Sequence, residues 1–210
     1  MNLHCKLKHE TQDHHTKIES VSLLKKIMAA NIALEEYQVL LQTFYGYIAP
    51  CETIILDSPY RFLLANRNKT SLLEKDLLAL GMDTRSISKL QRCGHLPELH
   101  EYEQAIGYLY VWEGATLGGQ LITKALEKTL QLRPDNGLTY FYGYGKETAA
   151  RWDAFCHFLN EIEEERYTKI ITSVHMVYAT LYDWMLDHDV VYENHQKLLW
   201  DDEYENIEER

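Results

Sequence analysis

The apolar positions of this chain recur at intervals of three and four residues, which is the period of an α-helix that buries one face. The longest such stripe lies between Asn31, which is expected to cap a helix, and Pro50, which is expected to end it. Its apolar members are Leu34, Tyr37, Leu40, Leu41, Phe44, Tyr45 and Ile48. No segment alternates apolar and polar residues between hairpin signals, so the pattern predicts helices without a sheet.

Local signals indicate where the other helices begin and end. Ser71 and Glu74 have the spacing of a capping box, and Gly81 suits the position just past a helix end. Pro97 suits a first helical turn, and residues 133–137 (RPDNG) indicate a turn. The helices expected from these signals cover residues 71–80, 97–132, 147–161 and 167–186. Together they predict an all-α, single-domain, irregular bundle of about seven or eight helices.

Length and charge narrow the class of protein. A chain of 210 residues suits one domain with a sizeable core. The net charge of -11 argues against nucleic acid as the main partner, because phosphate binding needs clustered Lys and Arg. The C-terminal end is mostly Asp and Glu, so we expect a helical domain over residues 1–190 and a solvated acidic tail over residues 191–210.

Neither a membrane span nor a disulfide framework is expected. No run approaches the roughly 18–20 apolar residues that cross a bilayer, and the N-terminus lacks the apolar stretch of a secretory signal. The four cysteines form no CxxC pair. These features indicate free thiols in a reducing cytoplasm.

A glycine-rich stretch interrupts the helix expected over residues 97–132. Gly114, Gly118 and Gly119 lie close together, and each costs a helix about 1 kcal/mol relative to alanine. Gly114 and Gly118 are four residues apart and share a face, which lets another group approach the backbone closely. That group could be a neighbouring helix or a flat ligand. Nearby charged residues disfavour a membrane dimer, and the lack of a following Gly-Lys-Ser/Thr disfavours a phosphate loop.

Among the ten histidines, His15 has the most informative surroundings. Glu19 lies four residues later, so the two side chains meet on one helix face. A carboxylate that accepts the Nδ1 proton leaves Nε2 free for a metal, although an incidental surface pair stays an alternative. Lys8 lies seven residues earlier, near the same face, where it can pair with an anionic group of a ligand. No histidine follows a Glu or Asp by three residues, which argues against a carboxylate-bridged dimetal site.

These two segments together resemble the heme oxygenase family, the enzymes that produce biliverdin. The N-terminal likeness is carried by Lys8, Thr11, His15, Thr16 and Glu19. The second is carried by residues 110–120 (YVWEGATLGGQ), which look like the distal helix of the bacterial branch. The resemblance covers roughly residues 3–187. It implies a heme oxygenase-like fold with heme between the first helix and a kinked distal helix.

The resemblance also implies roles for individual residues. His15 matches the proximal iron ligand, and the His-Thr-x-x-Glu spacing favours it over the adjacent His14. The glycines that match the distal, catalytic wall are Gly114, Gly118 and Gly119. The residues implied in holding heme are Lys8, Thr11, Glu19, Tyr110, Arg151 and Tyr178. Tyr108 competes with Tyr110, and His175 is either a further heme neighbour or a core residue.

The implied reaction is the oxidative cleavage of heme by dioxygen to biliverdin, ferrous iron and carbon monoxide, with heme as both cofactor and substrate. Electrons must come from a partner such as a ferredoxin, a flavodoxin or a reductase, because the chain has no nucleotide-binding fingerprint. The lysine-rich N-terminal segment is a plausible docking surface for that donor. One position departs from the family: Ala115 stands where mammalian members carry an aspartate that organises distal water, so proton delivery has to use other groups.

Three other functions are compatible with the sequence. A heme-binding or storage protein could have the same fold without turnover. A thiamin-degrading enzyme could have a related fold, with Cys156 as its nucleophile, although the spacing shows no adjacent base. A structural helical module would bind no ligand.

Overall fold

The computed structural model describes the backbone of residues 1–208 and the side chains of residues 1–189. Over this range the chain is all helical, and no segment forms a strand. The helices are α1 (Leu3–Glu10), α2 (Gln12–Glu19), α3 (Ser22–Met28), α4 (Leu34–Leu56), η1 (Arg61–Leu64), α5 (Thr70–Ala79), α6 (Thr84–Ser88), α7 (Tyr102–Leu130), α8 (Thr139–Tyr142), η2 (Gly145–Glu147), α9 (Thr148–Asn160), η3 (Glu164–Arg166) and α10 (Tyr167–Glu208), where η marks a 3-10 helix. The expected all-α class is confirmed.

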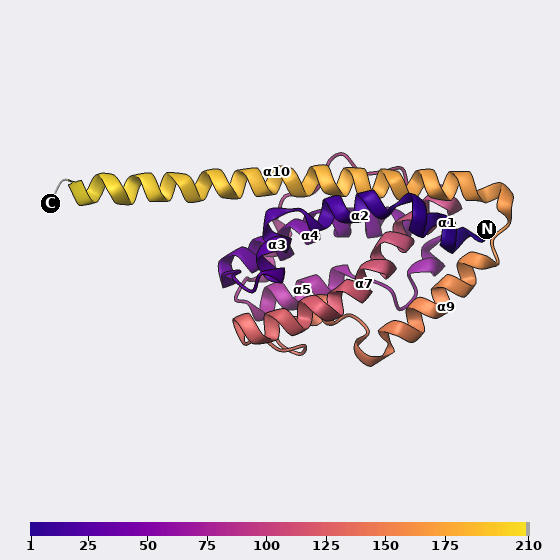
Figure 1. Ribbon diagram of the computed structural model, residues 1–210, viewed down its shortest axis with the longest axis horizontal. Coiled ribbons are helices and arrows are strands. Elements are labelled where there is room, and N and C mark those ends of the chain that lie inside the picture. The colour runs from indigo at the N-terminus through magenta and orange to yellow at the C-terminus, as the bar shows by residue number, and fades with distance from the viewer. Residues whose placement is uncertain (209–210) are drawn as a thin grey trace.

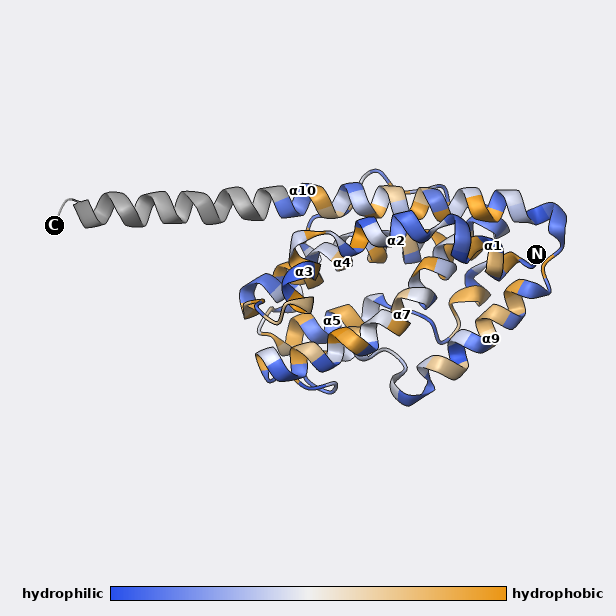
Figure 2. Cartoon of the chain, viewed as in Figure 1, coloured by the Kyte–Doolittle hydropathy of each residue, from blue (hydrophilic) through white to orange (hydrophobic). Residues whose placement is uncertain are grey.

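The core lies between the long helices (Figure 1). α10 runs along one edge of the molecule and packs against α7, while α2 lies against α10 and α4 packs on α5. Hydrophobic residues recur along the helices between hydrophilic ones (Figure 2), as expected of helices that bury one face. A Cβ added at Gly107 of α7 would lie 2.6 Å from the Cβ of Ser173 on α10, so the glycine permits the close crossing of these two helices.

α4 is longer than its stripe predicted, and two expectations about its ends are wrong. The N-cap residue is Ala33 rather than Asn31, and Glu36 accepts the Ala33 N–H at 2.8 Å. Pro50 lies inside the helix. A proline removes the N–H that would bond to the carbonyl four residues earlier. In this protein the Cys93 N–H bonds to the Gly46 carbonyl instead, at 2.9 Å, so the helix continues past Pro50.

The capping box expected at the start of α5 is not formed. The N-cap residue is Lys69, and Glu74 accepts a hydrogen bond from a tyrosine of α4 instead of folding back on Ser71. Two other residues cap this start. The buried Glu52 of α4 accepts the backbone N–H of Lys69 at 2.7 Å and of Thr70 at 3.1 Å, and the Asn68 side chain accepts that of Ser71 at 3.0 Å. A carboxylate at a helix N-terminus satisfies the free N–H groups there.

The glycine and turn signals behave as predicted. Gly81 follows α5 with a φ of +97°, and the Met82 N–H bonds to the Leu77 carbonyl at 3.0 Å, which completes a Schellman motif. Residues 133–137 form a turn, in which Gly137 has a φ of +93°. These positions were predictable because the left-handed backbone conformation strongly favours glycine.

Pro97 is not in a helical turn, contrary to expectation. It lies in the segment that leads to α7, whose N-cap residue is Glu101. The Gln104 side chain fixes this start by accepting the N–H groups of His100 and Glu101, both at 2.8 Å. α7 then runs without a break through Gly114, Gly118 and Gly119, so, contrary to expectation, these glycines do not interrupt the helix.

α10 begins close to the expected position and continues to Glu208, past the expected end at residue 186. The acidic tail expected over residues 191–210 lies outside the residues whose side chains the structure describes.

By length and composition alone, α4 is long and apolar enough to cross a membrane. The sequence analysis expected no segment with this property. The apolar window has a mean hydropathy of 1.3, and 67% of it is buried by the rest of the protein. A buried core helix has the same properties, so the observation is weak evidence for a membrane span.

Candidate functional site

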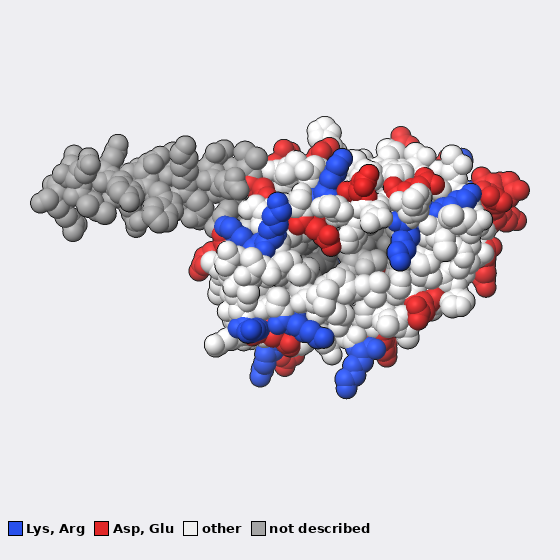
Figure 3. Space-filling model, in the orientation of Figure 1, with Lys and Arg blue, Asp and Glu red and all other residues white. Residues whose placement is uncertain are grey.

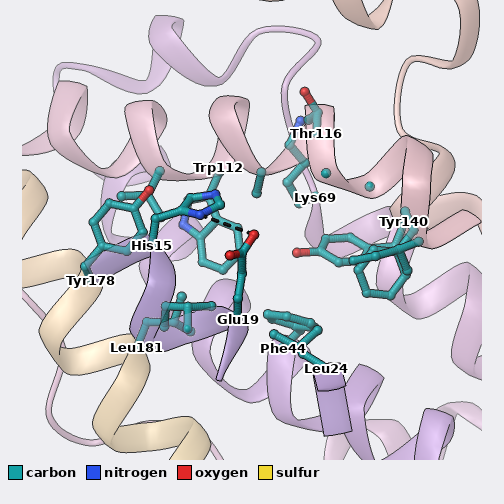
Figure 4. A pocket seen from close by; sticks show the side chains of 17 residues that line it. His15, Glu19, Leu24, Phe44, Lys69, Trp112, Thr116, Tyr140, Tyr178 and Leu181 are labelled. Atoms are coloured by element: carbon teal, nitrogen blue, oxygen red, sulfur yellow. Dashed lines mark ion pairs between the residues drawn. The ribbon is translucent and has the colours of Figure 1, made fainter. Parts of the chain in front are cut away.

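A cavity of about 140 Å³ lies between α2 and α7 (Figure 4). Its walls are mainly apolar and aromatic, and they come from six helices and the segments next to them. The lining residues are His15, Ile18, Glu19, Leu24, Phe44, Lys69, Val111, Trp112, Ala115, Thr116, Gly118, Gly119, Ile122, Tyr140, Phe141, Tyr178 and Leu181. The cavity thus brings together both segments that the sequence singled out, although about 100 residues separate them.

The α2 wall carries the predicted His15 and Glu19 pair. His15 Nδ1 lies 3.4 Å from Glu19 Oε1, and the two side chains are 57% and 67% exposed. Glu19 therefore leaves Nε2 of the imidazole free for a further ligand. The adjacent His14 lies on another side of α2, where its ring is 4.9 Å from His175 and 5.8 Å from Tyr178. Of the two neighbouring histidines, only His15 lines the cavity.

The three glycines of α7 have three different surroundings. A Cβ at Gly114 would contact the Trp152 ring of α9 at 3.5 Å, which is ordinary packing distance. A Cβ at Gly119 would lie 2.5 Å from the Phe141 carbonyl oxygen, so this glycine lets the α8 backbone approach α7. A Cβ at Gly118 would meet no described atom within 4 Å. Since Gly118 lines the cavity and faces open space, it is the glycine that leaves room for a ligand.

Tyr178 of α10 also lines the cavity. Burial raises the pKa of its phenol, so it is protonated at neutral pH. Its ring lies on α10 beside His15 (Figure 4). His175 does not line the cavity, and its ring contact is with His14.

Four other residues expected to hold a ligand are not among the lining residues. Lys8 is exposed on α1, and the break between α1 and α2 at Thr11 means that a spacing of seven no longer places Lys8 on the face of His15. The Thr11 hydroxyl donates to the Leu7 carbonyl at 2.8 Å. The Tyr110 ring is buried and packs at 5.9 Å from Trp152.

Arg151 is the fourth of these residues. Its guanidinium pairs with Glu147 at 3.1 Å, donates to the Asn66 carbonyl at 3.3 Å and lies 4.4 Å from the Tyr144 ring. The periodicity predicted the helix that carries Arg151, but it could not tell that these local partners occupy the side chain.

A buried charge network supports α7 from the side of α5, and no sequence pattern predicted it. Glu113 is 1% exposed and pairs with Lys69 Nζ at 3.0 Å and with Arg67 at 2.6 Å. Tyr144 donates to Glu113 at 2.8 Å and accepts from Lys69 Nζ at 2.8 Å. Burial lowers the pKa of Lys69, although the carboxylate of Glu113 opposes this. Because Glu113 is held in this network, its carboxylate does not replace the acidic side chain that is missing at Ala115.

Four polar or aromatic lining residues were not identified as site residues from the sequence: two lie on α7, one on α8 and one at the N-cap of α5. They are Lys69, Trp112, Thr116 and Tyr140. Thr116 Oγ1 donates back to the Glu113 carbonyl at 2.6 Å. The indole N–H of Trp112 and the hydroxyl of Tyr108 are buried without a hydrogen-bond partner among the described residues. No spacing could indicate Lys69 and Tyr140, because they meet the α7 residues only in the folded chain.

The cysteines are free, as expected, and only Cys5 is exposed. Burial raises the pKa of Cys156 to about 11, so this side chain is a neutral thiol at physiological pH. A catalytic cysteine needs the opposite shift, which argues against the thiamin-degrading alternative. Within residues 1–189, no group of three or more His, Cys, Asp or Glu side chains could hold a metal ion.

Comparison with known proteins adds a family and a fold. The family model described as heme oxygenase matches residues 1–187. A search of curated proteins finds no match. The fold is similar to heme oxygenase-2 from Synechocystis sp. PCC 6803, solved in complex with heme and NO, with a TM-score of 0.73 and 17% identity over 93% of this chain and 88% of that one.

Two further solved structures have the same fold. Heme oxygenase-1 from Synechocystis sp. PCC 6803, solved in complex with heme, has a TM-score of 0.71 and 14% identity over 97% of this chain and 100% of that one. A domain of unknown function with a heme oxygenase-like fold from Shewanella denitrificans has a TM-score of 0.71 and 15% identity over 93% of this chain and 95% of that one.

Proposed function

This chain belongs to the heme oxygenase family, and from that premise we propose that it binds heme and cleaves it with dioxygen to biliverdin, ferrous iron and carbon monoxide. One observation carries the proposal. His15, oriented by Glu19 on α2, and the open backbone at Gly118 on α7 line the same apolar cavity. A single imidazole opposite uncovered backbone suits a flat ligand that brings its own metal.

The residues of the cavity fit heme in their chemistry. Nε2 of His15 would hold the iron, and Glu19 would fix the ring and raise its basicity. Phe44, Leu181 and Ile122 would cover the porphyrin with apolar surface. When bound, heme supplies both the redox-active iron and the porphyrin that is oxidised.

The cavity has to widen to admit a ligand of this size. It encloses about 140 Å³, whereas ligand pockets typically have volumes of about 300–1,000 Å³. α2 is the wall that can move, because none of its eight residues is buried, whereas α7 buries residues along most of its length. We therefore expect α2 to be displaced from α7 when heme enters.

The chain's own residues would then act by position and exclusion. The α7 backbone at Gly118 would limit the space on the side of the heme opposite His15. The aromatic walls would keep bulk water from that space. The burial of Tyr110 and the local partners of Arg151 leave the heme contacts expected of Lys8, Thr11, Tyr110 and Arg151 as sequence-based expectations.

An external electron donor is part of the proposal, and a ferredoxin, a flavodoxin or a reductase would serve. On the N-terminal helices, Lys8, Lys17 and Lys25 are exposed. On the face seen in Figure 3, Lys and Arg side chains lie around a hollow, interspersed with Asp and Glu side chains. An acidic donor would be attracted to the exposed lysines among them, more strongly at low salt. A cytoplasmic location, where such donors occur, is proposed with it.

The test is turnover of the hemin complex. Hemin is added to the purified protein, the complex is reduced in air with ascorbate or with a ferredoxin and its reductase, and absorption spectra are recorded. The proposal predicts loss of the Soret band and appearance of a bile pigment in amounts that follow the hemin supplied. Loss of the Soret band without any bile pigment would contradict the enzymatic claim.

A heme-binding protein without turnover is the second candidate, and Ala115 is the observation that favours it. This position has no acidic side chain to organise water, and Glu113 beside it is held by Arg67 and Lys69. A stable Soret band that persists through reduction in air would support this candidate over the enzyme.

A further inference from the structure

Tyr140 is the cavity-lining residue whose polar group is best placed to meet a ligand. Its hydroxyl points into the cavity (Figure 4) and makes no hydrogen bond to any described residue. Three other polar residues of the wall already have partners. His15 pairs with Glu19, and the Thr116 hydroxyl donates to a carbonyl of its own helix. The Lys69 ammonium is held by the Glu113 network.

The fold holds Tyr140 firmly at this point. The Asp76 carboxylate accepts the backbone N–H groups of Thr139 and Tyr140, both at 2.7 Å, which fixes the start of α8. The tyrosine ring packs at 5.5 Å from the Phe44 ring and at 4.9 Å from the Phe141 ring. A side chain held by backbone caps and aromatic packing presents its hydroxyl at a fixed place, at little entropic cost when a ligand binds.

Tyr140 enters the cavity from the α7 wall and not from the α2 wall that carries His15. Gly119 is the reason, because only a residue without a Cβ allows the Phe141 carbonyl, and with it α8, to approach α7 so closely. The approach places a hydroxyl on the same wall as Ala115, which itself offers no polar group.

Two other donors of the cavity wall have no hydrogen-bond partner among the described residues, but both are less well placed than Tyr140. The indole N–H of Trp112 is buried away from the cavity surface. Tyr178 lies beside His15, at the end of the cavity away from Tyr140 (Figure 4). Tyr140 keeps accessible surface, and burial raises the pKa of its phenol, so the hydroxyl is a donor at any physiological pH.

We infer that the Tyr140 hydroxyl is the hydrogen-bond donor to small ligands bound on the α7 side of the heme, the position at which Ala115 offers none. The inference rests on the proposed function, since it needs heme held by His15. It adds a specific polar residue to a wall that otherwise supplies only backbone and apolar surface.

The experiment measures fluoride binding to the ferric hemin complex by absorption titration. Tyr140→Phe keeps the ring and its packing and removes the hydroxyl alone. Tyr142→Phe is the matched control, because it makes the same change on the same helix at a residue that does not line the cavity. The loss of one hydrogen bond is expected to weaken fluoride binding about tenfold in Tyr140→Phe and less than twofold in Tyr142→Phe.

The outcomes separate this inference from the proposed function. A wild-type Soret band together with equal fluoride affinities for wild type and Tyr140→Phe contradicts the inference alone. Equal weakening in Tyr140→Phe and Tyr142→Phe also contradicts it, because the effect would then not depend on the cavity. A wild-type protein that gives no Soret band contradicts the proposed function and the inference together.

Discussion

Alanine substitutions at Gly118 and Gly119 are expected to change stability in opposite directions. Both glycines lie inside α7, where alanine is favoured over glycine by about 1 kcal/mol. At Gly118 the new methyl group would meet no described atom within 4 Å, so this gain is kept. At Gly119 the methyl group would lie 2.5 Å from the Phe141 carbonyl oxygen, and relief requires the backbones of α7 and α8 to separate.

The magnitudes follow from these contacts. Overpacking a tight contact costs about 1–3 kcal/mol, and a backbone neighbour leaves little room to adjust, so Gly119→Ala is expected to lose about 2 kcal/mol net. In a domain of this size, 1 kcal/mol shifts the melting temperature by about 2–4 °C. Gly118→Ala should therefore melt about 2–4 °C higher than wild type, and Gly119→Ala about 4–8 °C lower.

The assay is thermal unfolding of the heme-free variants followed by circular dichroism, with Gly114→Ala as a third variant. Its methyl group would contact Trp152 at 3.5 Å, so its stability should match or exceed that of wild type. A second measurement is the affinity for hemin. The methyl group of Gly118→Ala projects into the cavity and should weaken hemin binding. Shifts of the same sign and size at Gly118 and Gly119 would refute the separate functions assigned to these glycines.

Three further predictions concern the network, the thiols and α2. Glu113→Ala leaves the buried lysine unpaired and should cost about 3–5 kcal/mol in urea unfolding, whereas Glu147→Ala, which removes a surface pair, should cost less than about 1 kcal/mol. A thiol reagent at pH 8 should label Cys5 rapidly and Cys156 hardly at all. The raised pKa of Cys156 keeps this thiol protonated until the pH approaches about 11. Rapid labelling of both cysteines would contradict this prediction. Hydrogen exchange should show fast amide exchange in free α2 that slows when hemin binds, and equal rates in both states would exclude the proposed displacement.

Periodicity and glycine signals predicted much of the fold because they depend on local physics. The Schellman glycine Gly81 and the 133–137 turn follow from backbone conformations that a short segment determines by itself. The predictions failed where a distant residue changes the local rule. Pro50 ends no helix because the Cys93 N–H satisfies the carbonyl that the proline leaves free. Ser71 does not cap α5, because Glu52 of another helix accepts the N–H groups of Lys69 and Thr70.

The candidate site divides in the same way. His15 and Glu19 could be predicted because four residues along a helix determine their meeting. The sequence shows that the glycines of α7 are unfavourable for a helix and therefore need an explanation. Only the structure shows that their surroundings differ. Tyr140 and Lys69 carried no signal. The position of Tyr140 depends on how α8 packs against α7, and that of Lys69 on its contact with Glu113 of α7.

Hemin titration of His15→Ala and His14→Ala tests the central claim most directly. The two residues are adjacent on α2, but only His15 lines the cavity, while His14 packs against His175 and Tyr178. The account predicts a Soret band of the same position and strength in wild type and His14→Ala, and a shifted or absent band in His15→Ala. Identical bound spectra for wild type and His15→Ala would contradict the assignment of His15 as the iron ligand.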